Sequence, residues 1–300
     1  MLLKDGRLRP LLRSVIYVVA TLLVAALLAA AIFPVIGGAL AHPAATFFVG
    51  ELCFCTAAVG VAVILRRWLD RRSVASLGLS LRGPWYRPLA VGIFLGAAMP
   101  CLIFALDEAF GFSHVTSIAS LGGGTAEIWR WIPVFVLVAF AEETSVRGYI
   151  LQNLWEEWGI VPAAVVTSLL FAVIHLGNPN SQANVAFTIA GLLAFSVWQC
   201  VGIIWTRSLW LAVGVHFAWN LFEGPVLGFL VSGLSLGPSV IGQSIAGPGW
   251  FTGGPFGPEA GASCLVALAA GFAVLYWLHR RGAFATTIDE REAYALAGQT

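Results

Sequence analysis

Charged side chains in the middle of an apolar stretch are the first candidates for chemistry. The run 131–155 is apolar enough to cross a membrane, yet it contains Glu142, Glu143 and Arg147. Each such charge at a helix centre costs roughly 2.5–3.5 kcal/mol on insertion scales. On a helix, Glu143 and Arg147 share a face and can pair, whereas Glu142 points about 100° away and has no local partner. This spacing predicts a structural pair beside a functional carboxylate.

Two later apolar runs supply imidazole and carboxamide groups. His175 lies at the end of the run 161–177, four residues after Phe171. His216 and Asn220 lie one helical turn apart in the run 208–223 and form one polar stripe with Glu223, which is near the outer end where water can solvate it. At a rise of about 1.5 Å per residue, His216 falls at a depth similar to that of Glu142, and His175 falls somewhat nearer the outer side. The sequence therefore predicts that these groups can meet inside a helix bundle.

Together these residue types are suited to amide hydrolysis. A carboxylate and an imidazole can hold and deprotonate a water molecule, and a second imidazole and a carboxamide can donate hydrogen bonds to an oxyanion. No Ser or Cys lies beside a His at a helical spacing, which disfavours a covalent nucleophile. Two His and a Glu can also bind zinc, but the ligands here lack a compact HExxH spacing and would come from separate helices.

The composition indicates a membrane protein. Of the 300 residues, 59% are hydrophobic and only 10% are charged, against about 25% charged in typical soluble domains. The net charge of +1 gives no indication of nucleic-acid binding, and the five cysteines lie in apolar runs where we expect them to pack as small apolar residues. We expect an all-α bundle of about eight transmembrane helices at 14–34, 45–65, 88–106, 131–154, 161–177, 185–205, 208–223 and 262–279.

The distribution of cations predicts the topology. With eight spans, every Lys and Arg except Arg130 and Arg147 falls on one side, so both termini are expected to be cytoplasmic. We expect the basic arm 1–13 to anchor this topology and the loop 66–87 to lie on an anionic membrane surface. The segment 224–261, rich in Gly and Pro, is expected to form a structured outer or partly re-entrant cover, and the tail after the last helix to be disordered. We divide the chain into N-terminal helices (1–125) and a catalytic bundle (126–300).

Three short motifs in order carry a family resemblance. Residues 142–147 match EExxxR, residues 171–175 match FxxxH and residues 216–220 match HxxxN. In this order on successive membrane helices they resemble the CPBP family of CAAX-type intramembrane proteases, which is related to type II CAAX prenyl endopeptidases and to bacteriocin-immunity (Abi-like) proteins. The resemblance covers about residues 130–223, and GGPFGPE at 253–259 also resembles bacterial members.

The resemblance implies a role for each motif residue. Glu142 is the expected general base, and His175 helps to hold the water. His216 and Asn220 are expected to form the oxyanion hole, while Glu143 and Arg147 brace the helix. The family is often labelled metalloprotease, but the prenyl endopeptidases favour a glutamate-dependent mechanism without a metal. We therefore expect no cofactor and keep zinc as the alternative.

Three classes of function remain open from the sequence. The first is an endopeptidase that cuts near the C-terminus of a membrane-attached or membrane protein, as a multi-pass protein of the cell (inner) membrane. The second is a non-catalytic membrane binding or immunity protein that keeps the protease fold. The third, a transporter with a proton relay, is disfavoured because no internal repeat is visible. The expected partners are a protein or peptide substrate and the lipid bilayer, with no nucleic acid and an unspecified oligomeric state.

Overall fold

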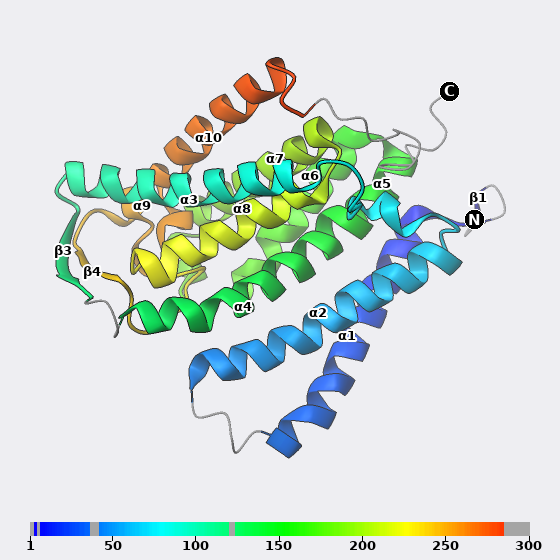
Figure 1. Cartoon of the computed structure of the whole chain (residues 1–300), viewed down its shortest axis with the longest axis horizontal. Coiled ribbons are helices and arrows are strands. Elements are labelled where there is room, and N and C mark those ends of the chain that lie inside the picture. Colours follow the sequence, from blue (N-terminus) through cyan, green and yellow to red (C-terminus); the bar gives the residue numbers. More distant parts are fainter. Residues whose placement is uncertain (1–2, 5–6, 37–41, 120–123, 285–300) are drawn as a thin grey trace.

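The chain folds into a bundle of long helices, as the apolar runs predict (Figure 1). The computed structural model describes residues 3–4, 7–36, 42–119 and 124–284. The long helices are α1 (Pro10–Ile36), α2 (Pro43–Trp68), α3 (Tyr86–Ala109), α4 (Gly124–Glu143), α5 (Leu151–Trp158), α6 (Ile160–Ile174), α7 (Val185–Thr206), α8 (Leu209–Leu221) and α10 (Ala262–Arg280). Strands are confined to β1 (Leu3–Lys4) with β2 (Arg7–Leu8), and β3 (Ser113–Ile118) with β4 (Ile241–Ile245). The all-α class is confirmed.

Hydrophobic length identifies the chain as a multi-pass membrane protein. Over the described residues, 6 helical segments are long and apolar enough to cross a membrane: those built on α1, α2, α3, α6, α7 and α10. The two other expected runs, 131–154 and 208–223, are the ones that carry the charged and polar candidates. Eight spans and cytoplasmic termini stay predictions.

A π-helical turn joins α4 to α5. Residues Thr144–Ile150 form the π-helix η3, and the backbone N–H of Leu151 donates to the carbonyl of Val146, five residues back. The helical rod therefore continues from α4 through η3 to the end of α5, beyond the expected 131–154. Single π turns are rare and occur often at functional sites. The sequence interpretation assumed regular helix here and missed the turn that directly follows Glu142 and Glu143.

Helices α3 and α8 approach each other at backbone distance because glycine lies on both sides of the contact. A Cβ on Gly92 would lie 2.3 Å from the carbonyl oxygen of Leu211, and one on Gly96 would lie 2.3 Å from that of Val215. From the other side, a Cβ on Gly214 would lie 2.6 Å from the carbonyl oxygen of Leu89. Small residues four apart permit this packing between membrane helices. Helix α3 thus fixes the helix that carries His216 and Asn220.

The segment 224–261 and the strand that follows α3 form one structure at one end of the bundle. Strands β3 and β4 pair in antiparallel fashion at that end (Figure 1). The segment 224–261 also contains α9 (Gly249–Thr252), η7 (Gly254–Phe256) and η8 (Pro258–Ala260), and it overlaps the π-helix η6 (Phe222–Val226). Phe229 and Phe256 are buried in the main hydrophobic core. The expectation that this segment is structured is confirmed, and its placement outside the membrane stays a prediction.

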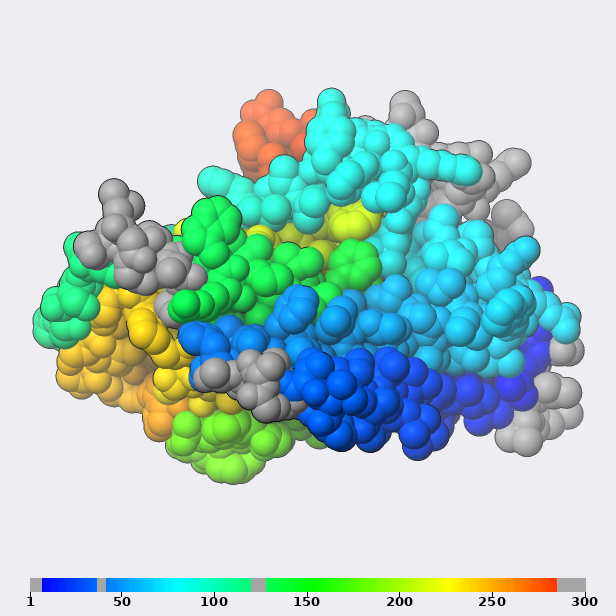
Figure 2. Space-filling view, turned by 60° about the horizontal axis from the view of Figure 1, so that its bottom comes forward, coloured from blue at the N-terminus to red at the C-terminus, as the bar shows by residue number. Residues whose placement is uncertain are grey.

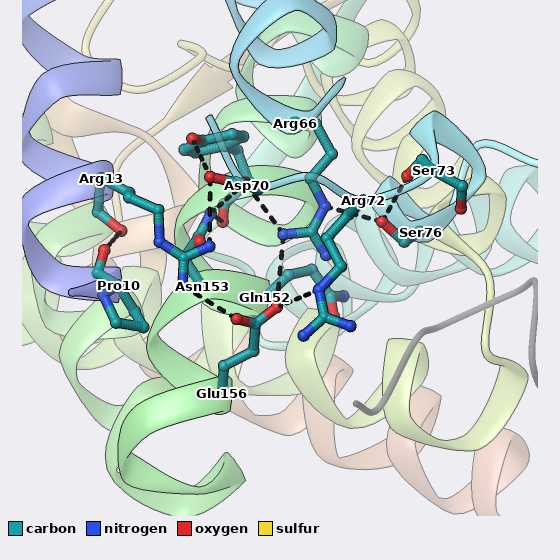
Figure 3. A network of polar contacts seen from close by, with 12 residues as sticks. Pro10, Arg13, Arg66, Asp70, Arg72, Ser73, Ser76, Gln152, Asn153 and Glu156 are labelled. Carbon is teal, nitrogen blue, oxygen red and sulfur yellow. Dashed lines mark hydrogen bonds and ion pairs between the residues drawn. The ribbon is translucent and has the colours of Figure 1, made fainter. Parts of the chain in front are cut away.

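A buried ionic network lies at the other end of the bundle (Figure 3). Asp70 forms ion pairs with Arg66 (3.2 Å) and Arg13 (3.3 Å). Glu156 of α5 pairs with Arg13 at 3.0 Å and with Arg72 at 3.3 Å. The cations of the arm and of the loop are therefore structural links as well as topology signals.

The loop 66–87 is partly packed against the rest of the protein. Its short 3-10 helix, η2 (Val74–Leu77), buries Ser76 and Leu77 completely, whereas Trp68 and Leu81 are exposed. That the loop lies on an anionic membrane surface stays a prediction. The cysteine interpretation is supported for the four buried residues, whereas Cys101 is exposed.

The first helices pack directly on the later ones. Helices α1 and α2 lie side by side along one face of the molecule (Figure 2), and α2 also packs on α4. The C-terminal tail, the arm residues 1–2 and 5–6 and the glycines at 122–123 lie outside the described residues.

Candidate active site

The two adjacent glutamates at the end of α4 have different surroundings. Glu143 is fully buried, and its Oε1 accepts hydrogen bonds from Nη1 of Arg147 (3.1 Å) and from Nδ1 of His216 (2.9 Å). The side chain of Glu142 is 26% exposed, and its Oε2 lies 3.9 Å from Nε2 of His216. The predicted pairing of Glu143 with Arg147 is confirmed. The carboxylate of Glu142 makes no hydrogen bond to a described residue, and Glu142 lines a cavity.

Arg147 links three helical elements beneath the site. Besides Glu143, it contacts α7, where its Nη2 donates to Oγ of Ser196 at 2.7 Å. Its guanidinium lies 4.5 Å from the centre of the Phe171 ring on α6. A charge this deeply buried is tolerated when its partners are held in good geometry. The residue therefore connects the EExxxR and FxxxH motifs through packing as well as through charge.

The orientation of His216 is set by Glu143. A carboxylate oxygen accepts, so Nδ1 of His216 carries the hydrogen of the 2.9 Å bond and Nε2 is the nitrogen that faces Glu142. The rings of Phe195 and Phe171 pack on the imidazole at centroid distances of 5.8 and 6.3 Å. Glu143 thus does more than brace its own helix. The sequence interpretation missed this contact because no local spacing connects positions on α4 and α8.

His175 ends α6 with an equally defined tautomer. Its Nδ1 lies 2.7 Å from the carbonyl oxygen of Phe171, which can only accept, so Nδ1 carries the hydrogen. The Nε2 lone pair is then available to a ligand. The Phe171 ring also packs on the imidazole at 4.4 Å. The FxxxH spacing therefore has a local physical reason, since Phe171 contributes both its carbonyl and its ring.

Asn220 presents an amide that no described residue of the chain binds through a hydrogen bond. It lies one turn after His216 on α8 and is 6% exposed. Its side chain makes no hydrogen bond within the part of the chain that the structure describes. A buried carboxamide without a partner is costly unless a ligand or water completes it. Asn220 is therefore available to donate to a bound molecule.

The four candidate catalytic residues meet in one cavity. Its volume is about 300 Å³, and Glu142, His175, His216 and Asn220 all line it. The predicted depth difference does not keep His175 away from the others. The chemical roles of these four residues stay predictions.

Two other glutamates line the cavity, and a third, Glu223, does not. Glu51 of α2 and Glu259 of η8 line the cavity. Glu259 is the single charge in the long segment 224–261, and that isolation was the available signal for it. Glu223, expected to be solvated, is completely buried and does not line the cavity, so this expectation is wrong.

The comparison with protein families agrees with the motifs. Residues 124–222 match the family model described as type II CAAX prenyl endopeptidase Rce1-like. The match runs from the first residue of α4 to one residue past α8 and contains all three motifs. Neither the curated proteins nor the solved structures give a match. The resemblance to CAAX-type membrane proteases is therefore confirmed over the segment that carries the four candidate catalytic residues.

Proposed function

We propose that this chain is a membrane-embedded endopeptidase that hydrolyses a peptide bond of a membrane-attached or membrane protein with a water activated by Glu142. The observation that carries the proposal is the unbonded Glu142 carboxylate 3.9 Å from His216, in a cavity that His175 and Asn220 also line. The family match supports a protease.

Two groups are arranged to hold the attacking water. Glu142 accepts one of its hydrogens and removes it as the bond to the carbonyl carbon forms. His175, with its Nδ1 hydrogen engaged by Phe171, accepts the other hydrogen at Nε2. The water oxygen then keeps a lone pair for attack. Glu142 afterwards returns the proton to the amine that leaves.

Two other groups are arranged to stabilise the oxyanion. Asn220 donates from its amide, and His216 donates from Nε2 when its imidazole is protonated, because Nδ1 already donates to Glu143. With His216 protonated, the positive charges of His216 and Arg147 balance the negative charges of Glu142 and Glu143. A neutral set is the less costly arrangement in a region of low dielectric.

The same geometry favours a mechanism without a metal over the zinc alternative. Among the described residues, no three His, Cys, Asp or Glu side chains are grouped so that they could hold a metal ion. Elemental analysis of active protein tests this, and stoichiometric zinc whose removal abolishes cleavage would support the metalloprotease mechanism instead.

Substrate trapping tests the proposed function. Wild-type protein and the Glu142→Gln variant are expressed in native membranes, and the proteins that copurify are compared by mass spectrometry. We expect a protein that accumulates intact on Glu142→Gln and is shortened in the presence of wild type. The control is Glu108→Gln, a carboxylate outside the cavity whose hydrogen bond from Ser113 a glutamine can also accept. Equal binding with no shortened product would favour the non-catalytic binding or immunity protein.

A further inference from the structure

The cavity contains more carboxylates than the proposed hydrolysis uses. Glu51 from α2 and Glu259 from η8 line it together with Glu142. Glu51 is close enough to Glu142 for the two charges to repel each other, and Glu259 interacts electrostatically with both histidines. Neither Glu51 nor Glu259 has a part in activating water or in stabilising the oxyanion.

Among the described residues that line the cavity, none is Lys or Arg, so the imidazoles of His175 and His216 are the basic groups there. In the proposed mechanism the charge of protonated His216 is already matched by Glu142 and Glu143, next to which it lies. Glu51 makes no hydrogen bond or ion pair with another described side chain, and Glu259 has only the hydroxyl of Ser232, at 2.7 Å. A desolvated carboxylate without a cation is costly, and a positive charge that enters the cavity would remove that cost.

The position of Glu259 is built into the fold. A Cβ on Gly191 of α7 would lie 1.8 Å from the backbone carbonyl oxygen of Glu259, so the absence of a side chain at Gly191 lets η8 reach α7. Glu259 is nine-tenths buried. A carboxylate held there by a glycine contact is a defined part of the cavity.

Other groups in the cavity are suited to a peptide. Trp131 stacks with Phe135 at a centroid distance of 5.7 Å and contacts Phe47 at 5.6 Å, which gives an aromatic wall from α2 and α4. Aromatic faces accept apolar side chains and also attract cations. Independently of the carboxylates, the buried and unpartnered amide of Asn220 calls for a polar ligand group such as a peptide carbonyl.

We infer that Glu51 and Glu259 make the site selective for an apolar substrate segment that carries a Lys or Arg side chain near the bond to be cut. This inference rests on the proposed function and specifies its substrate class. A free C-terminal carboxylate would add a negative charge to a cavity that has carboxylates and no Lys or Arg. The site is therefore selective against a bond next to the terminal carboxylate.

The test uses matched peptides with purified protein in nanodiscs. A set of apolar peptides in which one Lys is moved along the chain is compared with the same set carrying norleucine, which keeps the chain length without the charge. Each peptide is made with a terminal acid and a terminal amide. At the best position we expect kcat/KM for Lys to exceed that for norleucine about tenfold or more, the size of a close charge pair in a desolvated site.

The variants assign the preference to the two carboxylates. Glu51→Gln and Glu259→Gln are each expected to lower the Lys-to-norleucine ratio several-fold, while Glu108→Gln, outside the cavity, leaves it at the wild-type value. Two separate variants are used so that poor folding of one does not decide the result. A ratio near one in the wild type, or a ratio that neither glutamine variant changes, overturns the inference.

Binding separates this inference from the proposed function. The affinity of fluorescent Lys and norleucine peptides is measured by anisotropy with wild type and with Glu142→Gln. If no peptide is cut but Lys peptides bind more tightly through Glu51 or Glu259, the protease proposal fails and the selectivity stands. If peptides are cut and bound with equal efficiency, the selectivity fails and the protease stands. If no peptide binds, both fail.

Discussion

Glu142 and Glu143 are adjacent in the chain but belong to different parts of the site. Glu143 accepts from Arg147 and His216 and is closed to the cavity, whereas Glu142 makes no hydrogen bond and faces it. The i to i+4 spacing predicted the pair with Arg147 correctly. The bond between Glu143 and His216 joins different helices, and its existence depends on the packing of α4 against α8. Local spacing carries no information about that packing.

Arg147→Ala is expected to destabilise the protein. It leaves the buried Glu143 without its ion pair and removes the bond to Ser196. Breaking a buried pair by removing one partner typically costs about 3–5 kcal/mol. Thermal unfolding in detergent measures this, and Glu142→Gln, which removes no hydrogen bond, is the comparison. An Arg147→Ala protein as stable as wild type would show that Glu143 does not depend on this pair.

Asn220→Ala is expected to reduce turnover. Loss of one donor to an oxyanion typically lowers kcat by about 10²–10³, while substrate affinity stays nearly unchanged. Steady-state cleavage of a peptide in nanodiscs measures both, with folding checked by thermal unfolding. A variant whose KM rises while kcat holds would assign Asn220 to substrate positioning and remove it from the oxyanion hole.

At the scale of elements, the close contact of α3 and α8 positions the site. The two glycines of α3 are four residues apart, a spacing visible in the sequence, but their partner helix is not. The π turn η3 was not predictable either, because local spacing does not show the tertiary contacts of its residues, such as that of Oγ of Ser145 with the hydroxyl of Tyr17 at 2.7 Å. The lengths of the apolar runs predicted where the helices lie. They did not predict where a helix is interrupted or which helices contact each other.

Gly96→Ala is expected to impair folding and activity together. A Cβ at this position would lie 2.3 Å from the carbonyl oxygen of Val215, next to His216, so α8 must shift. Gly60 of α2 is the matched control, since nothing lies within 4 Å of its added Cβ. Gly60→Ala should be neutral or stabilise by about 0.5–1 kcal/mol, as alanine does in a helix. Equal behaviour of the two variants in thermal unfolding and cleavage would contradict the role of the α3–α8 contact.

Asp70 connects the end of α2 to η3 and α5. Its carboxylate accepts from the hydroxyl of Tyr149 (3.1 Å) and the amide of Asn153 (3.3 Å), and it pairs with Arg66 and Arg13. Asp70→Asn removes the negative charge from this buried network, and we expect a cost of about 3–5 kcal/mol in thermal unfolding. Glu157→Gln, which removes the charge of an ion pair whose partner Arg9 is half-exposed, should cost less than Asp70→Asn. Similar losses in both variants would contradict a special role for Asp70.

At the scale of the whole molecule, the lengths of the apolar runs predicted the helices, and the distribution of cations predicted their orientation. Seven of the eight expected helices are present within a few residues, because apolar runs of this length must be buried or must span the membrane. The fourth begins earlier, at Gly124, and contains the π-helix η3. The cavity contains residues of α2, α4, α6, α7, α8 and η8. Its acidic character was not predictable, because Glu51 lies far from the motifs in sequence and the segment 253–259, which ends at Glu259, gave no sign that this carboxylate enters the site.

The direction in which the molecule crosses the membrane is the remaining whole-molecule prediction. Arg13 and Arg66 are buried in ion pairs, yet Arg67, Arg71, Arg82 and Arg87 are exposed at the end opposite the β3–β4 sheet, so the bias of exposed cations persists. By the positive-inside rule, this end is predicted to be cytoplasmic. Leu81 (63% exposed) and Ile118 (74% exposed) mark the two ends.

Leu81→Cys and Ile118→Cys test that direction as a pair. A membrane-impermeant maleimide added to intact cells should label Ile118→Cys at once and Leu81→Cys only after the cells are permeabilised. The chain without an added cysteine gives the background labelling, to which the exposed Cys101 of α3 contributes. The reverse labelling pattern would place residues 66–87 outside the cell and reverse the predicted orientation of the whole bundle in the membrane. The cover over the cavity would then face the cytoplasm, and candidate substrates would have to be sought on that side.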